Sequence, residues 1–136
     1  MSKISKGEQR IINILKQNGI QFEREKTLTD FRNGHYRFDF YLPKYNVMIE
    51  FDGEQHFKFV SRFYNKLSDF QIAKERDRRK NSYCLARNIR LYRIPYWELD
   101  KISTLSDIIT NNHLVKNSFH NDLIWAEYQK HRTNSR

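Results

Sequence analysis

Three acidic side chains lie close together in the sequence, on two segments whose composition predicts neighbouring β-strands. Asp39 falls in His35–Leu42, and Glu50 and Asp52 fall in Val47–Asp52. Because strand side chains alternate between two faces, a hairpin with its apolar side on the core would gather all three carboxylates on the other side. Converging carboxylates repel one another unless a cation neutralises them. The pattern indicates a site for Mg²⁺ or Mn²⁺, which prefer oxygen ligands and assist phosphodiester hydrolysis.

The apolar residues of the two segments predict which face is buried. Seven are expected on one face, against a single core: Tyr36, Phe38, Phe40, Leu42, Val47, Ile49 and Phe51. An ordinary alternative exists for Asp39 taken alone, namely a salt bridge to Arg37 or Arg24, because most charged side chains are solvated. The convergence of three acids on strands, where Asp is disfavoured, favours the cation site.

Another acid lies in a long charged segment, Lys66–Asn88, that predicts a helix. Steps of three and four residues predict an inward stripe of Phe70, Ala73, Asp77, Asn81, Cys84 and Asn88. Asp77 lies in the middle of this stripe and is therefore not expected to be an ordinary solvated acid. It is either a buried structural acid, paired with Lys74, with Arg78 or with loop backbone, or an acid that serves the site.

The whole chain predicts one α/β domain in which a mixed sheet of about four strands is flanked by helices. The first elements expected are a helix at Lys6–Gln17, a strand at Gln21–Leu28, a turn at Thr29–Gly34 and the two strands that carry the acids. After the long helix we expect a strand at Arg90–Ile94, helical turns after Pro95 and at Leu105–Ile109, and a last amphipathic helix. Residues 1–110 would form the core domain, and residues 111–136 a C-terminal helical extension of it.

Composition limits the classes of protein to which the chain can belong. Its 136 residues suit one domain, and 25 Lys and Arg against 16 Asp and Glu give a formal net charge of +9. This excess points to a polyanionic partner, most often nucleic acid. The one cysteine, Cys84, excludes an internal disulfide and a cysteine-rich zinc site. With no apolar run long enough for a membrane span and no apolar signal core, we expect a soluble, intracellular, cytoplasmic protein without a membrane partner.

The order of several motifs resembles a known family. Asp39-Phe-Tyr-Leu-Pro followed by Val47-Met-Ile-Glu-Phe-Asp-Gly-Glu-Gln-His56 resembles the active-site hairpin of the PD-(D/E)xK nuclease superfamily. Glu75-Arg-Asp-Arg-Arg79 and Ile89-Arg-Leu-Tyr-Arg-Ile-Pro-Tyr-Trp-Glu98 resemble its very-short-patch repair endonuclease branch, and Glu8 stands where that branch has an acid. The resemblance runs from about Gly7 to Glu98. It implies a restriction-endonuclease-like fold and a metal-dependent DNA endonuclease.

The resemblance also implies a set of metal ligands. Asp39 would be the principal ligand, Asp52 a carboxylate ligand where the repair enzymes have a histidine, and Glu50 would occupy the acid position of the wider superfamily. The lysine that the wider pattern has two residues after this acid is replaced by Asp52. The group that activates water is therefore open among three candidates: His56, Gln55 and a migrated Lys74.

Three further residues take supporting roles by the same resemblance. His56 lies near the position of a second family histidine and would be a general acid or base, since its ordinary pKa is near neutral. Glu8 and Asp77 would orient water or that histidine, as carboxylates around such sites commonly do.

Two departures from the repair enzymes narrow the expected function. Phe57–Asn65 has no cluster of His and Cys to match their structural zinc site, and their DNA-wedging rings have no one-to-one counterparts in this chain. Mismatch repair is therefore not expected. We expect a nicking, or site- or structure-specific, endonuclease of homing or phage type, for which cutting both strands would need a homodimer or a partner protein. The alternatives are a branched-DNA (Holliday junction) resolvase and a nuclease fold that has lost catalysis and binds DNA.

Basic residues after the hairpin are the expected DNA contacts. Those expected to bind phosphates are Lys58, Arg62, Lys66, Lys74, Arg78 and Arg79. Aromatic rings alternate with cations in Phe57–Asn65, so this loop is expected to stack on or wedge into DNA. The ordinary alternative is that the rings belong to the core and the cations to a solvated helix face.

Overall fold

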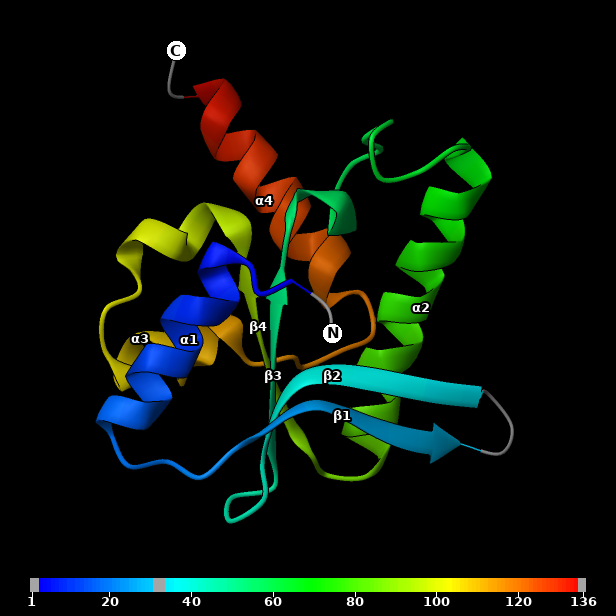
Figure 1. Ribbon diagram of the computed structural model, residues 1–136. Coiled ribbons are helices and arrows are strands. Elements are labelled where there is room, and N and C mark those ends of the chain that lie inside the picture. The colour runs from blue at the N-terminus through cyan, green and yellow to red at the C-terminus, as the bar shows by residue number, and fades with distance from the viewer. Residues whose placement is uncertain (1–2, 31–33, 135–136) are drawn as a thin grey trace.

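The computed structural model describes residues 3–30 and 34–134. The elements in chain order are α1 (Lys6–Gln17), β1 (Glu23–Asp30), β2 (Gly34–Leu42), β3 (Val47–Asp52), η1 (Glu54–His56), α2 (Leu67–Ala86), β4 (Arg90–Pro95), η2 (Tyr96–Lys101), α3 (Leu105–Ile108), η3 (Asn111–His113) and α4 (His120–Asn134). The strands form one sheet in the order β1-β2-β3-β4, in which only the β3–β4 pair is parallel. The predicted fold class is confirmed: a four-stranded mixed sheet is flanked by helices and followed by a C-terminal helix (Figure 1).

The bounds of the elements agree closely with the sequence patterns. α1 and β3 begin and end where predicted, whereas β1 begins at Glu23, two residues late, and continues to Asp30. α2 ends at Ala86 because Asn88, at φ 57°, adopts the left-handed conformation that commonly ends a helix. Residues 31–33 of the predicted turn lie outside the described residues.

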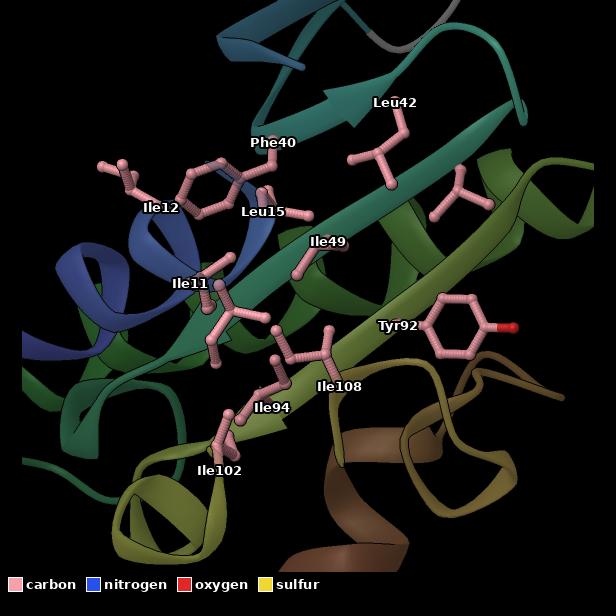
Figure 2. Packing of buried hydrophobic residues seen from close by; sticks show 12 residues of the cluster. Ile11, Ile12, Leu15, Phe40, Leu42, Ile49, Tyr92, Ile94, Ile102 and Ile108 are labelled. Carbon is pink, nitrogen blue, oxygen red and sulfur yellow. The ribbon is translucent and has the colours of Figure 1, made fainter. Parts of the chain in front are cut away.

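Helices cover both faces of the sheet (Figure 1). α1 and α3 lie on one face and α2 lies on the other. The core beneath α1 is mostly aliphatic, and Figure 2 shows the residues of α1, β2, β3 and β4 that meet there. Its buried members are Ile11, Ile12, Ile14, Leu15, Phe40, Leu42, Val47, Ile49, Tyr92, Ile94, Ile102 and Ile108. Over residues 3–30 and 34–134, no helix has the length and apolar character that crossing a membrane requires.

The face beneath α2 has a smaller core, and it corrects one prediction about β2. Tyr36 and Phe38 pack there with Met48 and Cys84, whereas Phe40 and its neighbours pack beneath α1. The prediction that all four apolar residues of β2 share one face is therefore wrong.

The cause of this change of face is a break in the strand at Asp39. The pairing of β2 with β3 ends at Phe40 opposite Ile49. On its other edge β2 pairs with β1, and there Phe40 and Phe38 both have partners but Asp39 has none. The residue of β1 opposite Asp39 is Glu25, whose φ of 55° departs from strand geometry. The strict alternation of side chains is lost at this point, and Asp39 lies where β2 leaves β3.

Gly7 allows the start of α1 to lie directly on β3. A β-carbon at this buried glycine would overlap the ring of Phe51, which points from β3 toward α1. Only a residue without a side chain fits there. This close approach also brings the next residue, Glu8, toward the part of the sheet where Asp39 lies.

We predict that Gly7→Ala destabilises the protein although alanine is the better helix former. Overlap with Phe51 should cost about 1–3 kcal/mol of unfolding free energy, against a gain of about 1 kcal/mol from helix propensity. Urea unfolding measures the difference, and Lys6→Ala, at an exposed position of the same turn, is the control with an expected change within about 0.5 kcal/mol. A rise in the urea midpoint of Gly7→Ala would contradict the packing described here.

Candidate functional site

Asp39 and Glu50 are locked together where β2 separates from β3. The backbone N–H of Asp39 donates to Glu50 Oε1 at 3.0 Å, and the backbone N–H of Phe51 donates to Asp39 Oδ2 at 2.8 Å. Each carboxylate therefore bonds to the backbone of the opposite strand, in place of a ladder hydrogen bond. The break in β2 fixes the two acids side by side.

A lysine from α2 completes this pair. Lys80 Nζ lies 2.9 Å from Glu50 Oε1, and the two residues are only 7% and 3% exposed. The ammonium also lies 4.7 Å from the centre of the Phe38 ring. Lys74, the expected candidate for a migrated lysine, pairs through Nζ with Asp122 at 3.0 Å instead. We call Asp39, Glu50 and Lys80 the carboxylate–lysine cluster.

Electrostatics make Asp39 the least satisfied member of this cluster. Burial and the neighbouring charge of Glu50 raise its pKa to about 8, although the hydrogen bond from Phe51 and the charge of Lys80 act in the opposite direction. Among the described residues, Asp39 Oδ1 and Glu50 Oε2 have no hydrogen-bond partner. Two carboxylate oxygens without a protein partner are a donor set that suits a hard divalent cation, whose charge would favour the ionised form of Asp39.

Glu8 contributes to the same region from α1. Its Oε1 accepts from the backbone N–H of Ser5, the Ser5 hydroxyl accepts from the N–H of Glu8, and Oε2 pairs with Arg24 at 3.2 Å. The charge of Glu8 raises the pKa of Asp39, after the larger effects of burial and Glu50. Both of its oxygens have protein partners, so Glu8 acts on Asp39 through its charge. Arg24, an alternative partner considered for Asp39, belongs to Glu8 instead.

Asp52 lies in a different, fully buried setting. Arg93 Nη1 from β4 donates to both of its oxygens, at 2.8 and 3.0 Å, and Asn121 from α4 donates at 3.0 Å. Arg93 Nε also bonds Asn81 Oδ1 at 2.7 Å, and both Arg93 and Asp52 are 0% exposed. The positive charge expected among the acids is thus supplied by protein side chains.

His56 and Asp77 form a hydrogen-bonded pair at the edge of this network. His56 Nδ1 lies 2.9 Å from Asp77 Oδ2 and 3.6 Å from Asp52 Oδ1, and Asp77 Oδ1 lies 3.6 Å from Arg93 Nη2. The expected contact of Asp77 with a histidine is present. Its alternative pairing with Lys74 or Arg78 is wrong, since both of those cations bind Asp122.

The neighbouring charges shift the pKa values of both His56 and Asp77. Burial alone would lower the pKa of His56, but the carboxylates of Asp52 and Asp77 outweigh it and raise the pKa to about 9. For Asp77, burial would raise the pKa, but Arg93 and His56 outweigh it and lower the pKa to about 2. His56 is therefore protonated and Asp77 ionised at neutral pH. We call Asp52, His56, Asp77, Asn81, Arg93 and Asn121 the arginine network.

The structure does not bring the three predicted metal ligands together as one group. Over the described ranges 3–30 and 34–134, no set of three or more His, Cys, Asp or Glu residues is arranged to hold a metal ion. Asp39 and Glu50 are adjacent, but Arg93 occupies both oxygens of Asp52. The side chain of Gln55 folds back over Gly53. The backbone carbonyl oxygen of Gln55 accepts a hydrogen bond from the Tyr64 hydroxyl at 2.9 Å.

The predicted DNA-binding residues divide into two groups. Lys58 and Arg62 lie near Glu54, at 3.4 and 3.7 Å, in the loop after η1, where Lys66 is also exposed. The other group lies on α2, where Lys74 and Arg78 bind Asp122 and Arg79 lies 3.5 Å from Glu75.

The aromatic residues of the loop also divide. Phe57 is buried against Trp97 and Trp125, with ring centres 4.8 and 5.6 Å away, so the ordinary alternative holds for this ring. Phe59 and Phe63 are exposed, 40% and 50%, and Arg62 lies over the Phe63 ring. They are the rings of this loop that a partner can reach.

We predict that removing Arg93 is strongly destabilising because it leaves Asp52 buried without its counter-charge. Arg93→Met should lower the unfolding free energy by about 3–5 kcal/mol in urea. The double variant Arg93→Met/Asp52→Asn removes the unpaired charge as well and should be more stable than the single variant. Equal stability of the two would show that the ion pair is not what holds this part of the interior.

We predict that His56 makes stability depend on pH above neutrality. Since its pKa is raised above the ordinary 6.5 to about 9, the stabilisation is complete below pH 6.5 and is lost as the pH rises through 9. Unfolding free energy should fall by about 3 kcal/mol more in the wild type than in His56→Gln between pH 6 and 9.5. Asp39, whose raised pKa also lowers stability up to about pH 8, contributes equally to both proteins. Parallel profiles would contradict the charged pair of His56 and Asp77.

Comparison with known proteins identifies a viral relative without a stated activity. No family model matches the chain. A stretch of 71 residues is 32% identical to the uncharacterized protein 307L of invertebrate iridescent virus 6, covering 51% of this chain and 36% of that protein. The chain thus spans about a third of the length of this relative.

Proposed function

We propose that this protein is a divalent-cation-dependent DNA endonuclease that hydrolyses phosphodiester bonds. The observation that carries the proposal is the carboxylate–lysine cluster, in which two acids on separating strands present unshared oxygens beside a buried lysine. The net charge of +9 supports a polyanionic substrate. Acids that collect a cation within a basic protein combine the two properties that cleavage of a phosphate backbone requires.

Each group of the site has a proposed task. A divalent cation, Mg²⁺ or Mn²⁺, held by Asp39 and Glu50 would neutralise charge on the phosphate and lower the pKa of water. Lys80 balances the charge of Glu50 and replaces the lysine that the sequence motif lacks. His56, which Asp77 and Asp52 hold in its protonated form, donates a proton to the leaving oxygen. We therefore assign His56 the role of general acid rather than general base in this proposal.

The basic residues after the hairpin are the proposed contacts to DNA. Lys58, Arg62 and Lys66 bring cations to the loop in which Phe59 and Phe63 are exposed. Cations bind phosphates, whereas exposed rings stack on bases. Because DNA is the substrate, we propose that the protein acts in the cytoplasm of the cell or of a phage- or virus-infected cell.

A second candidate function is a DNA-binding module without catalysis. One observation favours it, namely that Lys80 and Arg93 already neutralise Glu50 and Asp52 inside the protein. The two functions differ in whether DNA is cut. For the endonuclease, a panel of linear, mismatched, flapped and four-way substrates separates nicking, double-strand cutting by a homodimer and junction resolution.

We predict that the protein nicks supercoiled plasmid with Mg²⁺ or Mn²⁺ and that Asp39→Asn and Lys80→Met each reduce the rate by at least about 10²-fold. DNA binding measured by fluorescence anisotropy should stay within about threefold, because neither side chain is an exposed phosphate contact. Asp69→Asn and Lys16→Met change the same residue types at exposed positions and serve as matched controls.

Three outcomes would decide against parts of the proposal. Absence of nicking at any salt concentration with either metal, while DNA binding persists, favours the binding module. Full activity of Asp39→Asn would remove the assignment of the site. Full activity of Lys80→Met alone would remove only the role of the lysine.

A further inference from the structure

A pocket beside the C-terminal half of α2 takes no part in the site described above. Its volume is about 410 Å³, within the range of small-molecule pockets. Its lining residues come from β2, from the C-terminal half of α2 and from the segment before α4. No residue of the carboxylate–lysine cluster or of the arginine network lines it. The pocket therefore calls for an explanation of its own.

The lining of this pocket favours an anion. Three arginines line it, with Glu75 as the acid among the lining residues. Arg78 is held by Asp122 at 3.0 and 3.1 Å, whereas Arg79 lies 3.5 Å from Glu75 with 56% of its side chain exposed. Such an exposed ion pair is weak and readily exchanged. Guanidinium groups bind phosphate oxygens in a forked geometry, so phosphate is the anion that fits best.

Rings and a buried hydroxyl extend the site beyond a phosphate. Tyr36 is 2% exposed and lines the pocket, and its hydroxyl has no hydrogen-bond partner among the described residues. A buried hydroxyl of this kind is unfavourable until a partner completes it. The guanidinium of Arg87 lies 3.7 Å from the centre of the Tyr83 ring. Phe119, which is 53% exposed, also lines the pocket, and the guanidinium of Arg78 lies 5.3 Å from the centre of its ring. Arginine planes and aromatic faces are the surfaces on which nucleobases stack.

We propose that this pocket binds one nucleotide, with its phosphate on Arg79 and Arg87, its base against Phe119, and a polar atom bonded to the Tyr36 hydroxyl. Two sources share this chemistry: one unit of a bound DNA strand, and a free nucleotide. Tyr36 precedes Asp39 by three residues on β2, about 10 Å at 3.3 Å per residue, so a DNA strand bound at the carboxylate–lysine cluster can reach the pocket. The link to cleavage rests on the proposed function, whereas binding in the pocket does not.

The test measures binding in EDTA, where no cleavage occurs. The first probe is a labelled single-stranded oligonucleotide. The other probes, dAMP and inorganic phosphate, are measured alone and in competition with the oligonucleotide. Arg79→Ala/Arg87→Ala should weaken binding at least tenfold and reduce the salt slope, and Phe119→Ala should weaken it about threefold or more. Arg90→Ala/Lys16→Ala removes the same charge at exposed positions and should weaken binding less than threefold.

Tyr36→Phe separates a ligand-binding role from a structural one. Because the hydroxyl has no protein partner, its removal should leave the urea midpoint unchanged or higher, while it weakens binding about three- to tenfold. A stable Tyr36→Phe protein with unchanged binding overturns the role of the hydroxyl.

The probes distinguish a free nucleotide from a DNA strand as the ligand, and failure of the pocket proposal from failure of the proposed function. Binding of dAMP with the same sensitivity to the variants supports a free nucleotide, and an effect confined to the oligonucleotide supports a DNA strand. Equal losses in the pocket and control doubles, or phosphate competing as well as dAMP, overturn the proposal. A protein that binds in this way but never cuts removes the proposed function and leaves the pocket. A protein that cuts DNA while its pocket variants bind normally supports the proposed function and removes the pocket proposal.

Discussion

The buried guanidinium of Arg93 is the interaction on which the rest of the site depends. It leaves β4 and binds β3 through both oxygens of Asp52, and α2 through Asn81 at 2.7 Å and Asp77 at 3.6 Å. A buried charge that loses its partner costs several kcal/mol, so these elements pack well only in the one arrangement that pairs all the groups. That arrangement also sets which side of α2 faces the sheet. Lys80 reaches the carboxylate pair because of it.

The sequence was sufficient for most elements because their signals are local. The apolar spacing of α1 and the alternation in β3 depend on neighbouring residues alone, and both elements end where predicted. The face of β2 was predicted wrongly because the strand breaks at Asp39, opposite the left-handed Glu25. Period-two counting assumes an unbroken strand. The break is stabilised by an acidic side chain of another strand, so it leaves no periodic signal in the sequence of β2. Tyr36 and Phe40 therefore appear equivalent in the sequence although they pack in different cores.

The acids of the candidate site and His56 were predicted from the sequence, whereas its two buried cations were missed. Asp39 and Glu50 are conspicuous because carboxylates are rare on strands. Lys80 and Arg93 were missed because a basic residue in a basic chain carries no signal until its partner is known. A signal existed nonetheless. Lys80 lies three residues after Asp77 and so shares its inward side, and Arg93 interrupts the apolar residues that follow Arg90 in β4. A long cation at an inward position requires a buried acid opposite it.

The buried charges between α2 and the sheet explain where a cation would be accommodated. Three acids of this interior, Glu50, Asp52 and Asp77, are matched by three basic groups, Lys80, Arg93 and the protonated His56. Asp39 is the fourth acid, and it has no basic side chain at hydrogen-bonding distance among the described residues. Burial and Glu50 therefore raise its pKa to about 8, which means that its ionised form is unfavourable in the protein alone. A cation beside Asp39 relieves this cost, whereas one beside Asp52 must displace Arg93. The proposed site accordingly belongs to Asp39 and Glu50 rather than to all three strand carboxylates.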